Sequence, residues 1–216
     1  VLTQARTRAD LAGLAARKTA SAARGLLRGV GVSSYLEAIL GSPVETARLV
    51  LDADGGATLY VGTQSNGQGH ETVYTRMLAE ATGLDPALIR IVQGDSDRIR
   101  TGGGTGGSRS VTVQGTAMRS TVSALVVGFV DFLAAEWGQP VVFEDHRFGA
   151  KATNLRLTMA EAAALARSKS RADLLDVAQT IRLEAGAYPN GCHVVEVEID
   201  PETGALTLDR YTVVDD

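Results

Sequence analysis

The sequence predicts an α+β fold: a mixed sheet built partly from β-hairpins, with two main helices that each follow a glycine-rich loop. Three observations lead to this prediction. Apolar and polar residues alternate in several short segments that end at turn residues, as they do in hairpins. Two segments change to helical spacing directly after a cluster of glycines. Strands and helices do not alternate regularly enough for a doubly wound parallel sheet.

Composition restricts the classes of protein that fit. The 216 residues include 44% hydrophobic residues, enough to bury a core. The formal net charge of −4 would repel a polyanion, so nucleic acid is not an expected partner. The single cysteine, Cys192, cannot form an internal disulfide, which fits a cytoplasmic location. No apolar run approaches the roughly 18 residues of a membrane span, so none is expected.

The first half of the chain is expected to hold the first main helix and most of the strands. A helix is predicted over 6–27, and strands are predicted over 28–40, 45–55 and 57–63. Residues 88–97 are predicted to form a short strand that leads into a polar loop. Asp54, Gly55 and Gly56 would form a hairpin turn. The first main helix carries apolar residues from Val73 to Ala81 and ends at Gly83 as its C-cap.

The second half begins with the longer main helix, whose apolar face runs from Val122 to Leu133. Residues 140–158 read as a β-hairpin, followed by a short helix that Thr158 caps with Glu161. A second hairpin over 192–216 turns at residues 201–204. We therefore expect four segments: a helix or linker (1–28), an α+β region with both glycine loops (29–138), a small inserted β/α region (139–185) and a C-terminal hairpin (186–216) after which the chain is truncated.

Both glycine loops are suited to binding an anionic, hydrogen-bonding ligand. In "GTQSNGQGHET" the glycines at 67 and 69 leave the backbone bare beside the amide of Gln68, at a helix opening whose N–H groups lack acceptors. In "TGGGTGGSRS" bare backbone precedes two hydroxyls and the guanidinium of Arg109. Neither loop matches a Walker A or a dinucleotide fingerprint. The alternative is that the glycines only permit tight turns.

Three stretches together, "GTQSNGQGHET", "GGGTGGSRS" and "YPNGCHVVEVEIDPETG", resemble the molybdenum-cofactor-binding large subunit of the xanthine dehydrogenase and aldehyde oxidase family. The resemblance is greatest to its aerobic carbon monoxide dehydrogenase branch, and it covers the chain from about Arg24 to Asp216. It implies a molybdopterin cofactor, in the cytosine dinucleotide form. The cofactor-binding residues that it implies are Ser65, Asn66, Gly67, Gln68, Gly69, His70, Gly106, Gly107, Ser108, Arg109 and Ser110.

The resemblance also assigns roles. Gln68 would lie close to the metal's oxo ligand or the pterin and is the candidate catalytic residue. Ser108, Arg109 and Ser110 would lie against the pterin and the nucleotide part, where a guanidinium suits phosphate. The metal would be held by the cofactor's sulfurs, so no protein ligand to it is expected. His70 is read equally as a hydrogen-bond partner of the cofactor or as a helix cap.

The family oxidises a carbon centre, such as that of an aldehyde, a heterocycle or carbon monoxide, with oxygen derived from water. Its base glutamate belongs to a Gly-x-Gly-Glu-like segment that does not occur in this sequence, and its substrate loop is absent as well. The resemblance therefore implies a piece of a large subunit, inactive alone. The expected partners are the remainder of that subunit, an iron–sulfur small subunit and an FAD medium subunit in an oligomeric complex. The alternative is a stand-alone, non-catalytic phosphate- or nucleotide-binding module.

Several further residues have ordinary structural interpretations. Cys192 enters an alternating strand and is expected to be a small buried apolar residue. Glu196, Glu198 and Asp200 alternate along one face of that strand, where such a row usually meets solvent. Asp95 and Asp97 would either brace the glycine loop or close an ordinary turn.

Overall fold

The computed structural model describes residues 1–150 and 153–216, and the chain divides into two compact units. The first unit contains Val1–Ile39 and Gly186–Asp216, and the second contains Leu40–Ala185. Helices and strands are both abundant and one sheet is mixed, so the predicted α+β class is confirmed. Residues 151 and 152, inside the segment expected to form a hairpin, lie outside the described residues.

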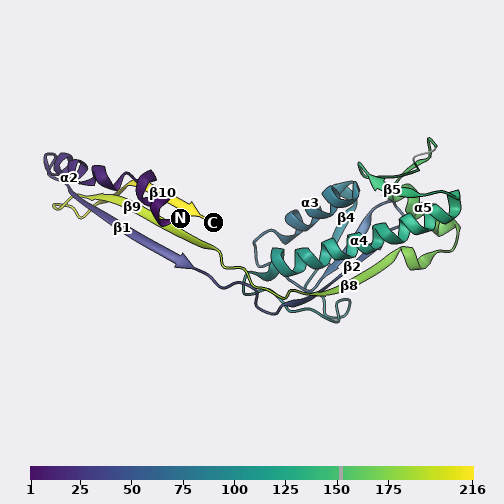
Figure 1. Cartoon of the computed structure of the whole chain (residues 1–216). Coiled ribbons are helices and arrows are strands. Elements are labelled where there is room, and N and C mark those ends of the chain that lie inside the picture. The colour runs from purple at the N-terminus through teal and green to yellow at the C-terminus, as the bar shows by residue number, and fades with distance from the viewer. Residues whose placement is uncertain (151–152) are drawn as a thin grey trace. The chain divides into compact units, whose positions relative to one another are not determined.

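The first unit is a three-stranded antiparallel sheet with helices over one face (Figure 1). Strand β9 is central, between β1 and β10. The elements are α1 (Leu2–Arg8), the 3₁₀ turn η1 (Leu11–Gly13), α2 (Leu14–Ala22), β1 (Leu27–Leu36), β9 (Asn190–Ile199) and β10 (Leu206–Asp215). The predicted C-terminal hairpin is confirmed, and its turn places Gly204 at a φ of 72°.

The predicted single helix over 6–27 is wrong, because the chain breaks between α1 and α2. Asp10 adopts a left-handed conformation with a φ of 50° and its carboxylate accepts a hydrogen bond from Gly13 N. The same carboxylate pairs with Arg17. A short side chain that bonds its own backbone competes with the helix, and here it ends one.

The second unit is built on the four-stranded sheet β4-β3-β2-β8, with α3 and α4 against it (Figure 1). Strands β3 and β4 are parallel, while β2 is antiparallel to β3 and β8. The unit contains β2 (Val44–Leu51), β3 (Ala57–Val61), α3 (His70–Thr82), η2 (Pro86–Leu88), β4 (Ile89–Val92), α4 (Arg109–Trp137), β5 (Val141–Glu144), β6 (Arg147–Ala150), β7 (Arg156–Thr158), α5 (Met159–Ser168), η3 (Ala172–Leu174) and β8 (Asp176–Arg182).

Several local predictions for this unit are confirmed. Helix α3 ends at Gly83, which has a φ of 73°, and α5 begins at a capping box formed by Thr158 and Glu161. The hairpin β5–β6 forms and is extended by β7 into a three-stranded sheet. Strand β8 was not predicted, because its residues alternate only weakly; it forms by pairing with β2.

Helix α4 is the central helix of this unit. By length and composition alone it could cross a membrane. Its buried face, from Val113 to Leu133, instead belongs to the main apolar core with residues of the sheet. That face also buries the polar side chains of Gln114 and Thr121, which bond to backbone groups of the neighbouring strands. The helix thus has the contacts of a core helix in a globular unit.

Candidate functional site

The two glycine loops lie at one edge of the four-stranded sheet. The first leaves the carboxyl end of β3 and enters α3, and β4 returns parallel to β3. Because the carboxyl ends of parallel strands meet at the same edge, the loop after β4 lies beside the first glycine loop. This βαβ arrangement was not predicted, since the sequence does not show that β4 pairs with β3 in parallel.

A pocket of about 520 Å³ opens between these segments. Its size suits a small-molecule ligand. Its walls come from the end of β3, the loop after β4 and the second glycine loop: Val61, Gly62, Gln64, Asn66, Gly94, Asp95, Ser96, Ile99, Arg100, Thr101, Gly102, Gly104 and Thr105. Of the predicted cofactor-binding residues, Asn66 alone lines it.

The glycines of the two loops fall into two groups. A Cβ at Gly62 or Gly102 would meet the other glycine's Cα at 2.5 Å, so these two permit the loops to touch. A Cβ at Gly103 would meet the guanidinium of Arg109 at 2.5 Å, and one at Gly107 would meet Gly41 N at 2.8 Å. Protein packing explains this first group.

The second group has no such explanation. A Cβ at each of these four positions would meet nothing within 4 Å: Gly67, Gly69, Gly104 and Gly106. Their backbone is bare and faces open space, which a ligand can approach closely. The interpretation that the loops are only tight turns accounts for positive φ at three of them, but Gly106 has no positive φ that would require glycine.

Arg109, the first residue of helix α4, holds the second glycine loop in place. Arg109 is 1% exposed, and its guanidinium donates to Glu45 Oε2 at 2.6 Å, to Gly104 O at 2.6 Å, to Ser42 O at 3.0 Å and to Val44 O at 2.7 Å. Glu45 is equally buried and also accepts from Gly103 N at 3.1 Å. The guanidinium is therefore directed into the protein and fixes the loop. The assignment of Arg109 as a cofactor residue stays a prediction.

Helix α4 also holds the start of the first loop. Gln114 is fully buried, and its Oε1 accepts from Gly62 N at 2.9 Å and from Thr63 N at 3.3 Å. Its Nε2 donates to Thr46 O at 3.1 Å. One helix thus positions both loops through two buried polar side chains. Sequence reasoning missed Glu45 and Gln114. The signal for Glu45 is that it occupies the core-facing register of an otherwise apolar alternating strand.

The openings of the two main helices meet at Tyr74. Its hydroxyl donates to Ser110 O at 2.9 Å and lies 2.8 Å from Thr63 Oγ1. Burial raises the pKa of Tyr74, so the phenol stays neutral and keeps its proton for the carbonyl. Two helix N-termini, each with unpaired backbone N–H groups, therefore lie close together, an arrangement that favours an anionic ligand.

The side chain of Gln68 is held by its own loop. Its Oε1 accepts from Asn66 N at 2.5 Å, and its Nε2 lies 3.0 Å from His70 Nε2. Because the amide nitrogen can only donate, His70 Nε2 is the acceptor and the imidazole proton resides on Nδ1. The second amide N–H of Gln68 has no acceptor among the described residues, so a ligand can accept it.

His70 is the first residue of α3, and its ring is 3% exposed, 4.9 Å from the ring of Tyr74. Its Nδ1 is buried and has no hydrogen-bond partner among the residues that the structure describes. It makes no cap bond in α3, so of the two interpretations the cap is not observed. A buried donor without an acceptor is costly, and a ligand oxygen would satisfy it.

The remaining predicted residues support the loops. Ser65 N donates to Gln93 Oε1 at 2.9 Å, and Ser108 adopts a left-handed φ of 53° just before α4. Asp95 closes its own turn by accepting from Asp97 N and Arg98 N, both at 3.1 Å, so of its two interpretations the turn is observed. Within the described part of the chain no group of three or more potential metal-binding side chains occurs.

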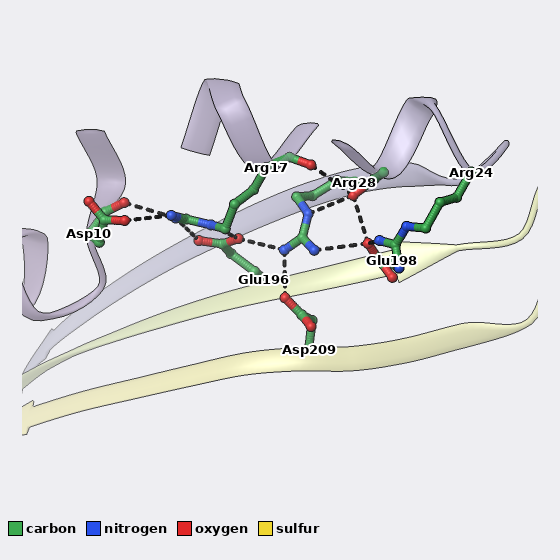
Figure 2. Close-up of polar contacts among 8 residues, drawn as sticks. Asp10, Arg17, Arg24, Arg28, Glu196, Glu198 and Asp209 are labelled. Atoms are coloured by element: carbon green, nitrogen blue, oxygen red, sulfur yellow. Dashed lines mark hydrogen bonds and ion pairs between the residues drawn. The ribbon is translucent and has the colours of Figure 1, made fainter. Parts of the chain in front are cut away.

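In the first unit, Cys192 is 1% exposed within a small apolar cluster, which confirms its structural interpretation. The expectation that Glu196 and Glu198 meet solvent is wrong. They are 2% and 9% exposed, and they bind arginines of α2 and β1 (Figure 2). The face of β9 that carries them is covered by helices, so burial is compensated by charge pairing.

The chain matches the model of the molybdopterin cofactor-binding domain over residues 4–216, and it belongs to that family. It is 31% identical over 193 residues to the 6-hydroxypseudooxynicotine dehydrogenase complex subunit gamma of Paenarthrobacter nicotinovorans, covering 85% of this chain and 24% of that protein. It is 26% identical over 208 residues to the carbon monoxide dehydrogenase large chain of Hydrogenophaga pseudoflava, covering 88% of this chain and 26% of that protein.

The fold is that of a solved carbon monoxide dehydrogenase from Oligotropha carboxidovorans, with a TM-score of 0.84 at 24% identity. The match covers 99% of this chain and 30% of the solved one. The chain thus spans about a quarter of the length of its curated relatives and under a third of the solved chain.

Proposed function

We propose that this chain forms part of the molybdopterin-binding large subunit of a molybdenum-dependent oxidoreductase. The observation that carries the proposal is the bare backbone of four glycines, in two loops that each lead into the opening of a main helix. Membership of the molybdopterin cofactor-binding family supplies the ligand that would fill this space. When bound, the cofactor supplies the redox chemistry that oxidises a carbon centre with oxygen derived from water.

The chain's own residues would bind and orient the cofactor. The backbone N–H groups of Gly69 and of the start of α3 would donate to its pterin and phosphate oxygens. The N–H of Gly67 donates to Ser65 Oγ at 3.4 Å, so Gly67 would serve the cofactor through its bare backbone. The free amide N–H of Gln68 and the Nδ1–H of His70 would donate to further acceptors of the cofactor. Arg109 would act through the loop that it fixes, because its guanidinium is bonded to protein groups.

The cofactor in this proposal is the cytosine dinucleotide form, and the substrate is an aldehyde, a heterocycle or carbon monoxide. The electron-transfer partners are an iron–sulfur small subunit and an FAD medium subunit in a cytoplasmic complex. The 216 residues alone are expected to be inactive with aldehydes, purines or carbon monoxide and an artificial electron acceptor. Molybdenum-dependent turnover by this chain alone would contradict that expectation.

The site is tested with a matched pair of glycines in the full-length gene product. Gly104 and Gly204 both have a φ of 72°, and a Cβ at either would meet nothing within 4 Å. Replacing either with Ala therefore introduces the same backbone strain, about 1–2 kcal/mol. Gly104→Ala should lower the molybdenum and pterin content at least about tenfold, because its methyl group occupies ligand space. Gly204→Ala should not.

A second variant tests the polar contact. Gln68→Ala should leave folding nearly unchanged, because the side chain is exposed and belongs to a loop. Loss of a hydrogen bond worth roughly 1–3 kcal/mol should reduce cofactor content or kcat by one to two decades. The assignment of the site fails if Gln68→Ala and Gly104→Ala both retain wild-type molybdenum content and kcat.

A further inference from the structure

The sheet of the first unit has two unlike faces. Strand register places one set of side chains of β1, β9 and β10 on the face opposite α1 and α2. In rows across the sheet, Leu27, Ile199 and Leu206 lie opposite one another, and Val197 and Leu208 lie in the next row. We call this surface the bare face; its apolar residues are Leu27, Val195, Val197, Ile199, Leu206, Leu208, Tyr211 and Val213.

The apolar side chains that the edge strands β1 and β10 place on this face are largely exposed, whereas those of the central strand β9 are half-buried. Leu27 is 59% exposed, Leu206 63%, Leu208 57% and Tyr211 55%. Glycines at positions 29 and 31 of β1 lie opposite Val197 and Val195 and contribute no side chain to cover them. A monomeric protein seldom exposes a contiguous apolar patch larger than roughly 300–600 Å². Within the described residues no helix of this unit covers the bare face.

One end of the bare face carries polar groups. Tyr35 donates to Asp215 Oδ1 at 3.0 Å, and the hydroxyl of Tyr211 lies 2.9 Å from His193 Nδ1. The hydrogen bond to the carboxylate raises the pKa of Tyr35. Buried interfaces have an apolar core and a polar rim in which tyrosine is common. The apolar residues of the bare face match such a core, and the hydrogen-bonded tyrosines at its end match such a rim.

We propose that the bare face is covered by the part of the large subunit that lies outside these 216 residues. The related solved chain contains this fold over 99% of the present residues and is more than three times as long. The curated relatives are about four times as long. An apolar sheet face without charged residues at its centre fits the interior of one polypeptide better than the wetter interface between separable subunits.

The inference depends on chain length and family membership and not on cofactor binding, so it can fail separately from the proposed function. The experiment measures maleimide labelling of two variants that each carry one introduced cysteine, with the wild type as background because Cys192 is buried. Leu208→Cys reports on the bare face. Val32→Cys is its matched control, because Val32 is 58% exposed and pairs with Val194 on the opposite face.

In the 216-residue chain both probes should react at similar rates. In the full-length gene product, purified without other subunits, labelling of Leu208→Cys should slow by at least about tenfold more than labelling of Val32→Cys. Equal rates for Leu208→Cys in the two proteins would overturn the proposal, as would equal slowing of both probes. Protection that rises with the concentration of the 216-residue chain would identify a second copy as the occupant and would also overturn it. The proposal would also be overturned if Leu208→Cys in the full-length gene product were protected from maleimide only after another subunit is added.

Discussion

Each unit contains buried pairs of arginine and carboxylate, but the two sets are built differently. In the second unit Arg109 and Glu45 are 1% exposed and form one isolated pair. In the first unit Arg17 and Arg28 share Glu196, and each also pairs with further carboxylates, some of them half exposed (Figure 2). The isolated pair fixes the shape of a loop, whereas the network fastens helix α2 to the sheet.

The isolated pair and the network have different structural roles. Every bond of Arg109 beyond its pair ends on a backbone carbonyl of the second loop or of the segment entering β2. An isolated buried pair contributes little net stability, but removing one partner leaves a charge without compensation. The network tolerates loss better, because each arginine keeps another partner. Four predictions test this contrast, from the largest expected effect to the smallest.

Arg109→Met should lower the free energy of unfolding by about 3–5 kcal/mol, because Glu45 is left buried without its partner. Denaturant unfolding of the 216-residue chain measures the loss. The double variant Arg109→Met with Glu45→Leu should recover most of that stability, since no charge stays buried. A loss below about 1 kcal/mol in the single variant would contradict the role of an isolated pair.

The second-largest effect should be a loss of stability of the first unit at acid pH. The hydrogen bond from Arg17 lowers the pKa of Glu196, and that from Ser21, followed by Arg28, lowers the pKa of Glu198. The pKa of a glutamate in the unfolded chain is about 4.3. When its pKa in the folded protein is lower, the ionised carboxylate stabilises the fold above about pH 4.3, and this stabilisation is lost as the pH falls through the pKa of the folded protein. The protection of the α2 amides against hydrogen exchange, relative to the intrinsic exchange rate at the same pH, should therefore fall below about pH 4. The double variant Glu196→Gln with Glu198→Gln should lose this dependence, and an unchanged dependence would contradict the prediction.

Glu196→Gln alone should have a smaller effect than Arg109→Met, about 1–2 kcal/mol at neutral pH. Arg17 keeps its bond to Asp10, and Arg28 keeps its bonds to Glu198 and Asp209. The amide also retains acceptor capacity for one arginine. The measurement is denaturant unfolding under the conditions used for Arg109→Met. A loss as large as that of the isolated pair would remove the contrast between the two sets.

Arg24→Ala should have the smallest effect. Its side chain is 57% exposed, and it reaches the network only through Glu198, which keeps Arg28 and Ser21. Exposed ion pairs contribute little because solvent screens them, so the Tm should change by no more than about 1 °C. A fall of several degrees in a thermal melt would show that the network depends on its outermost member.

Local features of the fold could be predicted from the sequence. The positions of α3 and α4 follow from the change of hydrophobic period after each glycine cluster. The end of α3 at Gly83 and the start of α5 at Thr158 follow from residues within one turn of the helix end. These features depend on neighbours a few residues apart, which the sequence displays directly.

Tertiary contacts decided the rest. Glu196 was expected in solvent because its strand alternates, yet it meets Arg17 from 179 residues away, and only the pairing of β1 with β9 and the docking of α2 bring them together. Arg109 was expected to face a phosphate, and the orientation of its guanidinium is set by Glu45, 64 residues earlier on β2. The sequence by itself determined which backbone is bare and where the helices open, because those depend on residue type and local spacing. Which charges are buried, and which face of a sheet stays uncovered, depended on partners that only folding brings into contact.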